Sequence, residues 1–178
     1  MHVKQKVMSD IKIIPLNNTQ ETLNVLSTML VEVVANGGSV GFMHPLTFAE
    51  ANSFWTGSLA AADRGERIVL GAFASDELVA TVTLLLGLPP NQPHRAEIAK
   101  MMTRINYRGK GIAKALLQAA EQLAIEHNRS LLVLDTAQDE GASGLYEKQG
   151  FTLTGIIPDY ALKPHGGLTA TMIYWKRI

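Results

Sequence analysis

The chain has 178 residues, 47% of them hydrophobic, which is enough for one domain with a buried core. Its 16 basic and 16 acidic residues balance, which argues against a general nucleic-acid binder, and the lack of cysteine excludes disulfides and thiolate chemistry. No apolar run is long enough to span a membrane, and the first ten residues lack the pattern of a signal peptide. We therefore expect one soluble domain over residues 1–178, located in the cytoplasm, with neither nucleic acid nor membrane as a partner.

The first half of the chain predicts an alternation of strands and helices. Thr19 is suited to cap a helix whose apolar positions recur at helical spacing, and Thr47 is suited to open a second one. Two apolar runs separated by Ser75, Asp76 and Glu77 are typical of a β-hairpin. The expected strands cover residues 11–14, 68–74, 78–86 and 95–104, and the expected helices cover residues 19–35 and 48–64.

The second half contains the strongest helical pattern, over residues 111–127, where apolar side chains line one broad face. Residues 131–134 form a continuous apolar run, as in a strand that is covered on both faces. The remaining expected elements are a helix over 141–149, a strand near 151–153, a loop at 159–167 and a last strand over 168–175. This order predicts an α/β (α+β) fold, with one mixed central β-sheet flanked by helices on both faces.

A glycine-rich basic segment, Arg108-Gly109-Lys110-Gly111-Ile112-Ala113, joins an expected strand to the strongest helix. Two glycines one residue apart let the backbone turn tightly and leave its N–H groups accessible. The N-terminus of the following helix adds unpaired N–H groups and the positive end of the helix dipole, so the segment is suited to bind a phosphate or pyrophosphate. A purely structural turn is the alternative. A nucleotide-binding P-loop is disfavoured, because Lys110 is not followed by serine or threonine.

A second motif, Ala142-x-x-Leu145-Tyr146-x-Lys148-x-Gly150-Phe151, follows about thirty residues later. The two motifs, with a helix and a strand between them, resemble the signature of the GNAT superfamily of N-acetyltransferases, and the resemblance covers most of the chain. Segments at 36–43, 95–100 and 134–136 are similar, within that superfamily, to the tabtoxin resistance acetyltransferases. Ile105 stands where a proline is usual in the family, which we expect to loosen the turn before the glycine-rich segment.

The resemblance implies acetyl-CoA as the cofactor. The segment 108–114 then holds the pyrophosphate, and the preceding strand presents backbone groups to the pantetheine arm. The tyrosine that matches Tyr146 protonates the departing thiolate in the family; an ordinary half-buried aromatic is the alternative. Asp139 replaces a common asparagine, and Ser143 is a candidate to take over its contact. The residues expected at the cofactor are Met101, Met102, Thr103, Arg108, Gly109, Lys110, Gly111, Ile112, Ala113, Lys114, Ser143 and Tyr146.

Acetyl transfer to an amine requires the amine to lose a proton. Glu97 and Asp135 are the candidate bases, because they belong to strands beside the expected cofactor segment, where clefts open in α/β folds. The alternatives are that Glu97 pairs with Arg95 or with a cross-strand residue, and that Asp135 caps a turn or binds the amine as an ion pair. A backbone N–H of Met101 or Met102 is a candidate to stabilise the developing oxyanion.

The acceptor is expected to be a small-molecule amine, and the resemblance to tabtoxin resistance enzymes implies an amino-acid-like toxin or antibiotic. A protein N-terminus, a polyamine, and a sensor or scaffold domain that binds acetyl-CoA without turnover are the alternatives. The residues expected around the acceptor are Phe42, His44, Trp55, Asp159 and Tyr160. No metal is expected, because the five histidines lack metal-ligand spacing. The sequence fits a monomer, or a homodimer that pairs through an apolar edge strand at 170–175.

Overall fold

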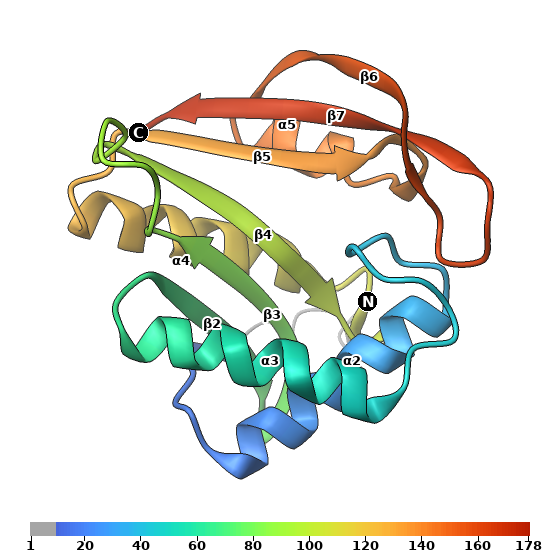
Figure 1. Cartoon of the computed structure of the whole chain (residues 1–178). Coiled ribbons are helices and arrows are strands. Elements are labelled where there is room, and N and C mark those ends of the chain that lie inside the picture. Colours follow the sequence, from blue (N-terminus) through green and yellow to red (C-terminus); the bar gives the residue numbers. More distant parts are fainter. Residues whose placement is uncertain (1–9) are drawn as a thin grey trace.

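Hydrophobic side chains gather on both faces of a central β-sheet, and helices cover each face (Figure 1). The computed structural model describes residues 10–178, except for the side chain of Ser143. One hydrophobic cluster includes α4, Ile112–Glu126, and the other includes α2, Gln20–Ala35, and α3, Phe48–Asp63. The predicted α/β (α+β) fold, a mixed sheet between helices, is therefore confirmed.

The sheet has the strand order β1-β2-β3-β4-β5-β7-β6 over the described residues. Its strands are β1 (Ile11–Pro15), β2 (Arg67–Ala74), β3 (Glu77–Leu85), β4 (Arg95–Thr103), β5 (Leu131–Ala137), β6 (Thr152–Leu162) and β7 (Leu168–Arg177). Neighbouring strands are antiparallel, except that β4 and β5 are parallel. The remaining elements are the short helix α5 (Ser143–Lys148) and the 3₁₀ turns η1 (Ile105–Tyr107) and η2 (Gln138–Glu140). Within residues 10–178, no helix is both long and apolar enough to cross a membrane.

Local capping residues set the starts of the first two helices, as predicted. The Thr19 hydroxyl accepts a hydrogen bond of 3.1 Å from the N–H of Thr22 at the start of α2. Thr47 and Glu50 form a reciprocal capping box at the start of α3, in which each side chain accepts a hydrogen bond from the backbone N–H of the other residue. Both helices then bury the face that carries their periodic apolar residues.

The C-terminal hairpin differs from the prediction. The strand β6 continues through Asp159 and Tyr160, which the sequence analysis assigned to a loop at 159–167. The pairing of β6 with β7 shifts register around Pro158 and Asp159, and Asp159 has a φ of 52°. Because proline and aspartate are typical of turns, the sequence pattern indicated a loop here and not a strand. The irregularity is tolerated because β6 lies at the edge of the sheet.

The last strand, β7, lies between β5 and β6. The sequence analysis placed residues 170–175 at an edge, where they were available to pair with a second copy, and this placement is wrong. Both sides of the β7 backbone already pair with strands of the same chain. The edges of the described sheet are instead β1 and β6.

The parallel strands β4 and β5 separate soon after they meet. They pair only over Arg95–Glu97 and Leu131–Val133, and Figure 1 shows them diverging toward their C-terminal ends. The register between β3 and β4 shifts after Thr81, and the nearby Lys100 has a φ of 50°. Such a bulge bends a strand away from its neighbour. The bend leaves one side of β4 without a strand partner and opens a cleft between the two strands.

We expect Thr47→Ala to lower the free energy of unfolding by about 1 kcal/mol, because the N-cap bond to Glu50 is lost. Urea denaturation followed by circular dichroism measures this change. Thr56→Ala is the matched control, since Thr56 is exposed in the same helix and its hydroxyl donates to the carbonyl of Asn52. Its effect should stay within about 0.5 kcal/mol. Equal losses in the two variants would contradict the capping role of Thr47.

Candidate functional site

The divergence of β4 and β5 creates a cleft with a volume of about 1060 Å³. Its walls come from the loop between α2 and α3, the segment that precedes α4, the helix α5 and the C-terminal hairpin. Segments that are far apart in the sequence therefore meet at this one place. The three predicted catalytic residues, Glu97, Asp135 and Tyr146, all line the cleft.

The glycine-rich segment forms one end of the cleft. Gly109 and Gly111 have φ values of 71° and 81°, in the left-handed region that glycine adopts without steric cost. Gly111 is the N-cap of α4, and no side chain caps this helix, so its first N–H groups are suited to bind an anion. Arg108 lines the cleft, whereas Lys110 does not and places its Nζ 4.8 Å from the ring centre of Tyr107. The segment thus has the geometry of the predicted anion site, and Arg108 and Lys114 are its positively charged residues that line the cleft.

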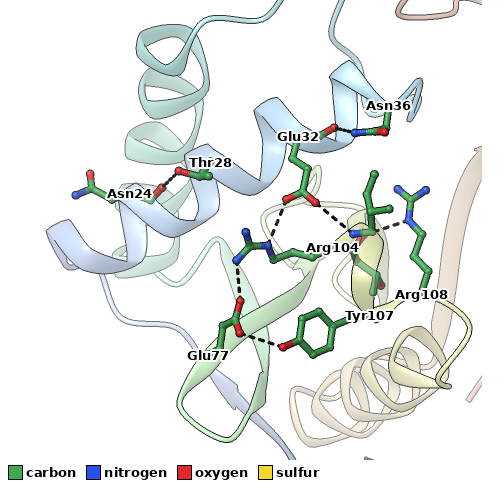
Figure 2. A network of polar contacts seen from close by, with 10 residues as sticks. Asn24, Thr28, Glu32, Asn36, Glu77, Arg104, Tyr107 and Arg108 are labelled. Atoms are coloured by element: carbon green, nitrogen blue, oxygen red, sulfur yellow. Dashed lines mark hydrogen bonds and ion pairs between the residues drawn. The ribbon is translucent and has the colours of Figure 1, made fainter. Parts of the chain in front are cut away.

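A network of polar contacts holds the turn before this segment (Figure 2). Glu32 of α2 accepts hydrogen bonds of 3.3 Å from Arg104 Nε and from the N–H of Ile105. Arg104 and the hydroxyl of Tyr107 both donate to Glu77, each at 3.0 Å. A proline in place of Ile105 has no N–H to donate, so isoleucine here permits the bond to Glu32. The turn is therefore held by side chains, and the expected loosening is not observed.

The cleft-facing part of β4 offers mainly backbone groups. Met102 has only 2% of its surface exposed, because its side chain belongs to the core under α2 and α3. Met101 packs against the core on the other face. Both residues and Thr103 line the cleft, and β4 has no strand partner on this side beyond Glu97. Its N–H and C=O groups are suited to bind an extended ligand as an added strand would be bound.

Tyr146 projects from α5 into the cleft wall and is almost fully buried, with 6% of its surface exposed. Its ring lies edge-on to Phe151, with ring centres 6.0 Å apart, and 5.8 Å from the ring of Tyr174. Burial, together with the negative charges of Glu140 and Asp135, raises the pKa of Tyr146 to about 12. The phenol therefore keeps its proton throughout the neutral pH range.

The two candidate bases have different surroundings. Glu97 forms an ion pair of 2.6 Å with Arg95 on the same strand, which is the pairing that the sequence left open as an alternative. Asp135 is exposed on β5 and accepts a hydrogen bond of 3.3 Å from the hydroxyl of Thr171. Its charge also acts on Tyr146. Of the two candidate bases, Asp135 is thus the one whose charge acts on the predicted general acid.

The predicted acceptor residues divide into two groups. Phe42 and Tyr160 line the cleft, as expected for walls of a binding site. Trp55 does not, because its side chain is fully buried in the core under α2 and α3. Its ring centre lies 5.0 Å from that of Phe54, against which it packs edge-on. Trp55 therefore supports the α2–α3 wall from behind, and its assignment to the acceptor contacts is corrected.

Two further predicted acceptor residues also lie outside the cleft lining. The ring of His44 lies 4.4 Å from that of His165, so His44 contacts the turn between β6 and β7. Asp159 is exposed at the irregular position of β6. The side chain of Ser143, predicted at the cofactor, is outside the described part of the structure. Within residues 10–178, no group of three or more histidine, aspartate or glutamate residues is placed to hold a metal ion.

Two residues that the sequence analysis did not assign to the site line the cleft. Lys100 projects from the bulge of β4 toward the rings of Phe42 and Phe54, 6.0 and 5.6 Å from its Nζ. Glu140 accepts a hydrogen bond from the N–H of Ser39, and burial raises its pKa. A lysine within a largely apolar strand was the available signal for Lys100. No local pattern points to Glu140, whose partner is 101 residues away.

The fold and the cleft are those of a protein suited to bind a phosphate-bearing ligand along the separated strand β4. The Acetyltransferase (GNAT) family matches residues 39–151, and the chain belongs to this family. The superfamily predicted from the two motifs is therefore confirmed.

Relatives of known activity match parts of the chain. Human N-acetylaspartate synthetase is 39% identical over 72 residues, which are 40% of this chain and 24% of that protein. Escherichia coli streptothricin acetyltransferase is 32% identical over 107 residues, which are 59% of each protein. The matches thus span less than two thirds of either relative. The chain is also similar to the solved structure of an acetyltransferase from Salmonella typhimurium with its cofactor acetyl-CoA. The TM-score is 0.77 at 14% identity, and the match covers 94% of both chains, which shows the shared fold. The closer similarity to tabtoxin resistance acetyltransferases stays a prediction.

Acetyl-CoA, which the GNAT fold uses, fits the groups that the cleft offers. A Cβ atom added to Gly109 would meet nothing within 4 Å, so the space above the glycine-rich segment is open. Arg108 and the uncapped start of α4 are suited to bind a pyrophosphate there. The unpaired side of β4 is suited to bind the amides of a pantetheine arm.

We expect the phenol of Tyr146 to ionise near pH 12, because burial disfavours the phenolate. An ultraviolet titration of the wild type minus that of Tyr146→Phe isolates this group. Because the pKa is raised above its ordinary value of about 10, the stability linked to the neutral phenol is fully present below pH 10 and is lost as the pH rises through about 12. A difference titration centred near pH 10 would contradict the buried environment of Tyr146.

Proposed function

We propose that this protein is an N-acetyltransferase that moves the acetyl group of acetyl-CoA to the amine of a small molecule. The observation that carries the proposal is the presence of three groups in one cleft: the glycine-rich segment 108–114, the protonated phenol of Tyr146 and the exposed carboxylate of Asp135. Acetyl transfer to an amine needs a bound acetyl donor, a group that accepts a proton from the amine, and a group that donates a hydrogen bond or a proton to the departing thiolate. Family membership supports the same reaction.

When bound, acetyl-CoA supplies the acetyl group as a thioester. In our proposal, Arg108 and the first N–H groups of α4 hold its pyrophosphate, and the unpaired side of β4 holds the pantetheine arm. A backbone N–H of Met101 or Met102 then donates to the oxygen that becomes negative during transfer. Alignment of the two substrates in one cleft contributes to the rate independently of any acid or base.

Tyr146 acts on the leaving group through its hydroxyl hydrogen. A free thiol has a pKa of about 8.5, so a phenol with a pKa of about 12 is the weaker acid by roughly 3.5 units. Tyr146 therefore stabilises the developing thiolate chiefly by donating a hydrogen bond, and complete proton transfer from it is unfavourable. Because the phenol is neutral at pH 7, its hydroxyl is always able to donate this hydrogen bond.

Asp135 is the base that we favour. An α-amino group with a pKa near 8 is neutral about a tenth of the time at pH 7, and a lysine-type amine much less often, so a nearby carboxylate accelerates deprotonation. The charge of Glu97 is already compensated by Arg95 at 2.6 Å. Asp135 instead accepts a hydrogen bond from the neutral hydroxyl of Thr171. Its carboxylate is thus more available to an incoming ammonium group, directly or through a water.

The acceptor in this proposal is a small amine of the amino-acid-like kind, which includes toxins and antibiotics. The names of the relatives support small acceptors: one is an N-acetylaspartate synthetase and another is a streptothricin acetyltransferase. The cleft walls at Phe42 and Tyr160 offer apolar contacts for such a molecule. A cytoplasmic location and a monomeric or homodimeric state stay predictions.

A thiol-release assay with acetyl-CoA tests the proposed function, using amino acids, streptothricin, polyamines and a peptide with a free N-terminus as acceptors. We expect CoA release with small amines, and a kcat about 10- to 100-fold lower for Tyr146→Phe, which loses a hydrogen bond to a developing anion. Asp135→Asn should lower kcat more than Glu97→Gln does, because it removes the proposed proton acceptor. Binding of acetyl-CoA without CoA release with any amine would overturn the proposal in favour of a sensor or scaffold.

A comparison of two glycines tests whether the segment 108–114 binds the cofactor, because one glycine lies inside this segment and the other lies outside it. Gly109 and Gly65 have similar positive φ values, 71° and 76°, and an added Cβ would meet nothing within 4 Å at either position. Alanine should therefore cost a similar backbone strain at both, roughly 1 kcal/mol in urea denaturation. We expect Gly109→Ala to weaken CoA binding at least about tenfold in calorimetry and Gly65→Ala to leave it unchanged. Equal affinities in the two variants would contradict the assignment.

A further inference from the structure

Lys100 occupies a position that local backbone energetics do not favour. Its φ of 50° lies in the left-handed region, which is strained for residues other than glycine. The bulge that requires this conformation turns the side chain into the cleft, on the side of Phe42 and Phe54. Gly41 faces it there, and a Cβ on Gly41 would lie 3.4 Å from the Lys100 Nζ. The absence of a side chain at Gly41 therefore leaves space around the ammonium group.

Within residues 10–178, no carboxylate lies close enough to this ammonium group to form an ion pair with it. Among the ion pairs of residues 10–178, none includes Lys100. Burial lowers the pKa of Lys100. The negative charge of Asp135 raises this pKa, and the positive charge of Arg67 lowers it further. A half-buried charge without a paired anion is costly, and its cost falls when an anion binds. The structure thus presents a desolvated cation at the surface of a binding cleft.

Opposite charges face the cleft from its two diverging strands. Lys100 is on β4 and Asp135 is on β5, and each lines the cleft. Asp135 interacts electrostatically with both Lys100 and Tyr146, so its charge is near enough to influence both groups. A molecule with a carboxylate and an amine matches this arrangement, with its carboxylate at Lys100 and its ammonium group toward Asp135. In that orientation the amine is on the side of Tyr146, where the proposed chemistry needs it.

We propose that Lys100 binds a carboxylate of the acceptor, and that the protein acetylates amines that also carry a carboxylate. This inference rests on the proposed acetyltransferase function, and it adds the acceptor group that is recognised and the residue that recognises it. The Lys100 ammonium group donates hydrogen bonds to the carboxylate, and this charged contact orients the amine within the cleft. The rings of Phe42 and Phe54 exclude water around the contact, which strengthens it.

The first test compares matched acceptors with the wild-type protein. α- and ω-Amino acids with increasing spacing between amine and carboxylate are each assayed beside their carboxamides, which keep the size and remove the charge. Rates are compared at equal concentrations of neutral amine, since the amide changes the pKa of the amine. We expect kcat/KM to be at least about tenfold higher for the best acid than for its amide, mainly through KM.

The second test removes the charge of Lys100. Lys100→Met keeps the length and the apolar stem of the side chain, and it should reduce the ratio of acid to amide kcat/KM to about one. Lys100→Arg should restore part of the ratio. The control is Lys12→Met, because Lys12 is exposed on the edge strand β1 and should leave the ratio unchanged. Calorimetric titration of the preferred acid into the complex with CoA gives a readout without turnover, and its affinity should fall at least about tenfold in Lys100→Met.

The outcomes separate this inference from the proposed function. If the wild type acetylates simple amines and amides as well as acids, or if the ratio survives Lys100→Met, the carboxylate inference is overturned and the acetyltransferase proposal stands. If no amine releases CoA, the proposed function fails, and equal affinity of the CoA complex for acids and amides then also overturns the role of Lys100. If Lys100→Met does not fold, the wild-type comparison decides the question by itself.

Discussion

The separation of β4 from β5 is the constraint on which the rest of the site depends. The two strands pair over Arg95–Glu97 and Leu131–Val133 and then diverge, so one side of β4 has no strand partner. Backbone N–H and C=O groups in a protein interior need hydrogen-bond partners, and an extended ligand can provide them. The bulge at Lys100 coincides with the bend and directs a charged side chain into the same cleft. One irregularity of one strand therefore accounts for both the shape of the cleft and the position of the Lys100 ammonium group.

The position of the glycine-rich segment depends on contacts with two elements that precede it in the chain. Glu32 of α2 and Glu77 at the start of β3 hold Arg104 and the turn that leads into the segment. Each of these partly exposed contacts contributes little stability by itself. Their effect is positional, because they connect the glycine-rich segment to α2 and β3. The bond from Ser39 to Glu140 connects the loop between α2 and α3 to the opposite wall of the cleft.

Desolvation organises the chemistry of the cleft. Burial keeps the phenol of Tyr146 protonated and lowers the pKa of Lys100. Asp135 remains exposed on β5, and its charge acts on both of these groups. The three groups thus offer a hydrogen-bond donor, a cation and a carboxylate around one space. In our proposals these groups act, respectively, on the leaving thiolate, on the acceptor carboxylate and on the acceptor amine. Glu97 is less suited to act as the base, because Arg95 already compensates its charge.

The sequence by itself determined the features whose causes are local. The caps at Thr19 and Thr47, the left-handed glycines at Gly109 and Gly111, and the motif around Tyr146 could be predicted because each depends on a few neighbouring residues. The tertiary structure alone decided that β7 is an internal strand, that Trp55 supports the wall from the core, and that Lys100 and Glu140 line the cleft. These features depend on strand order, on a bulge and on contacts such as the one between Ser39 and Glu140. They arise from packing between residues far apart in the chain, and no short pattern encodes such packing.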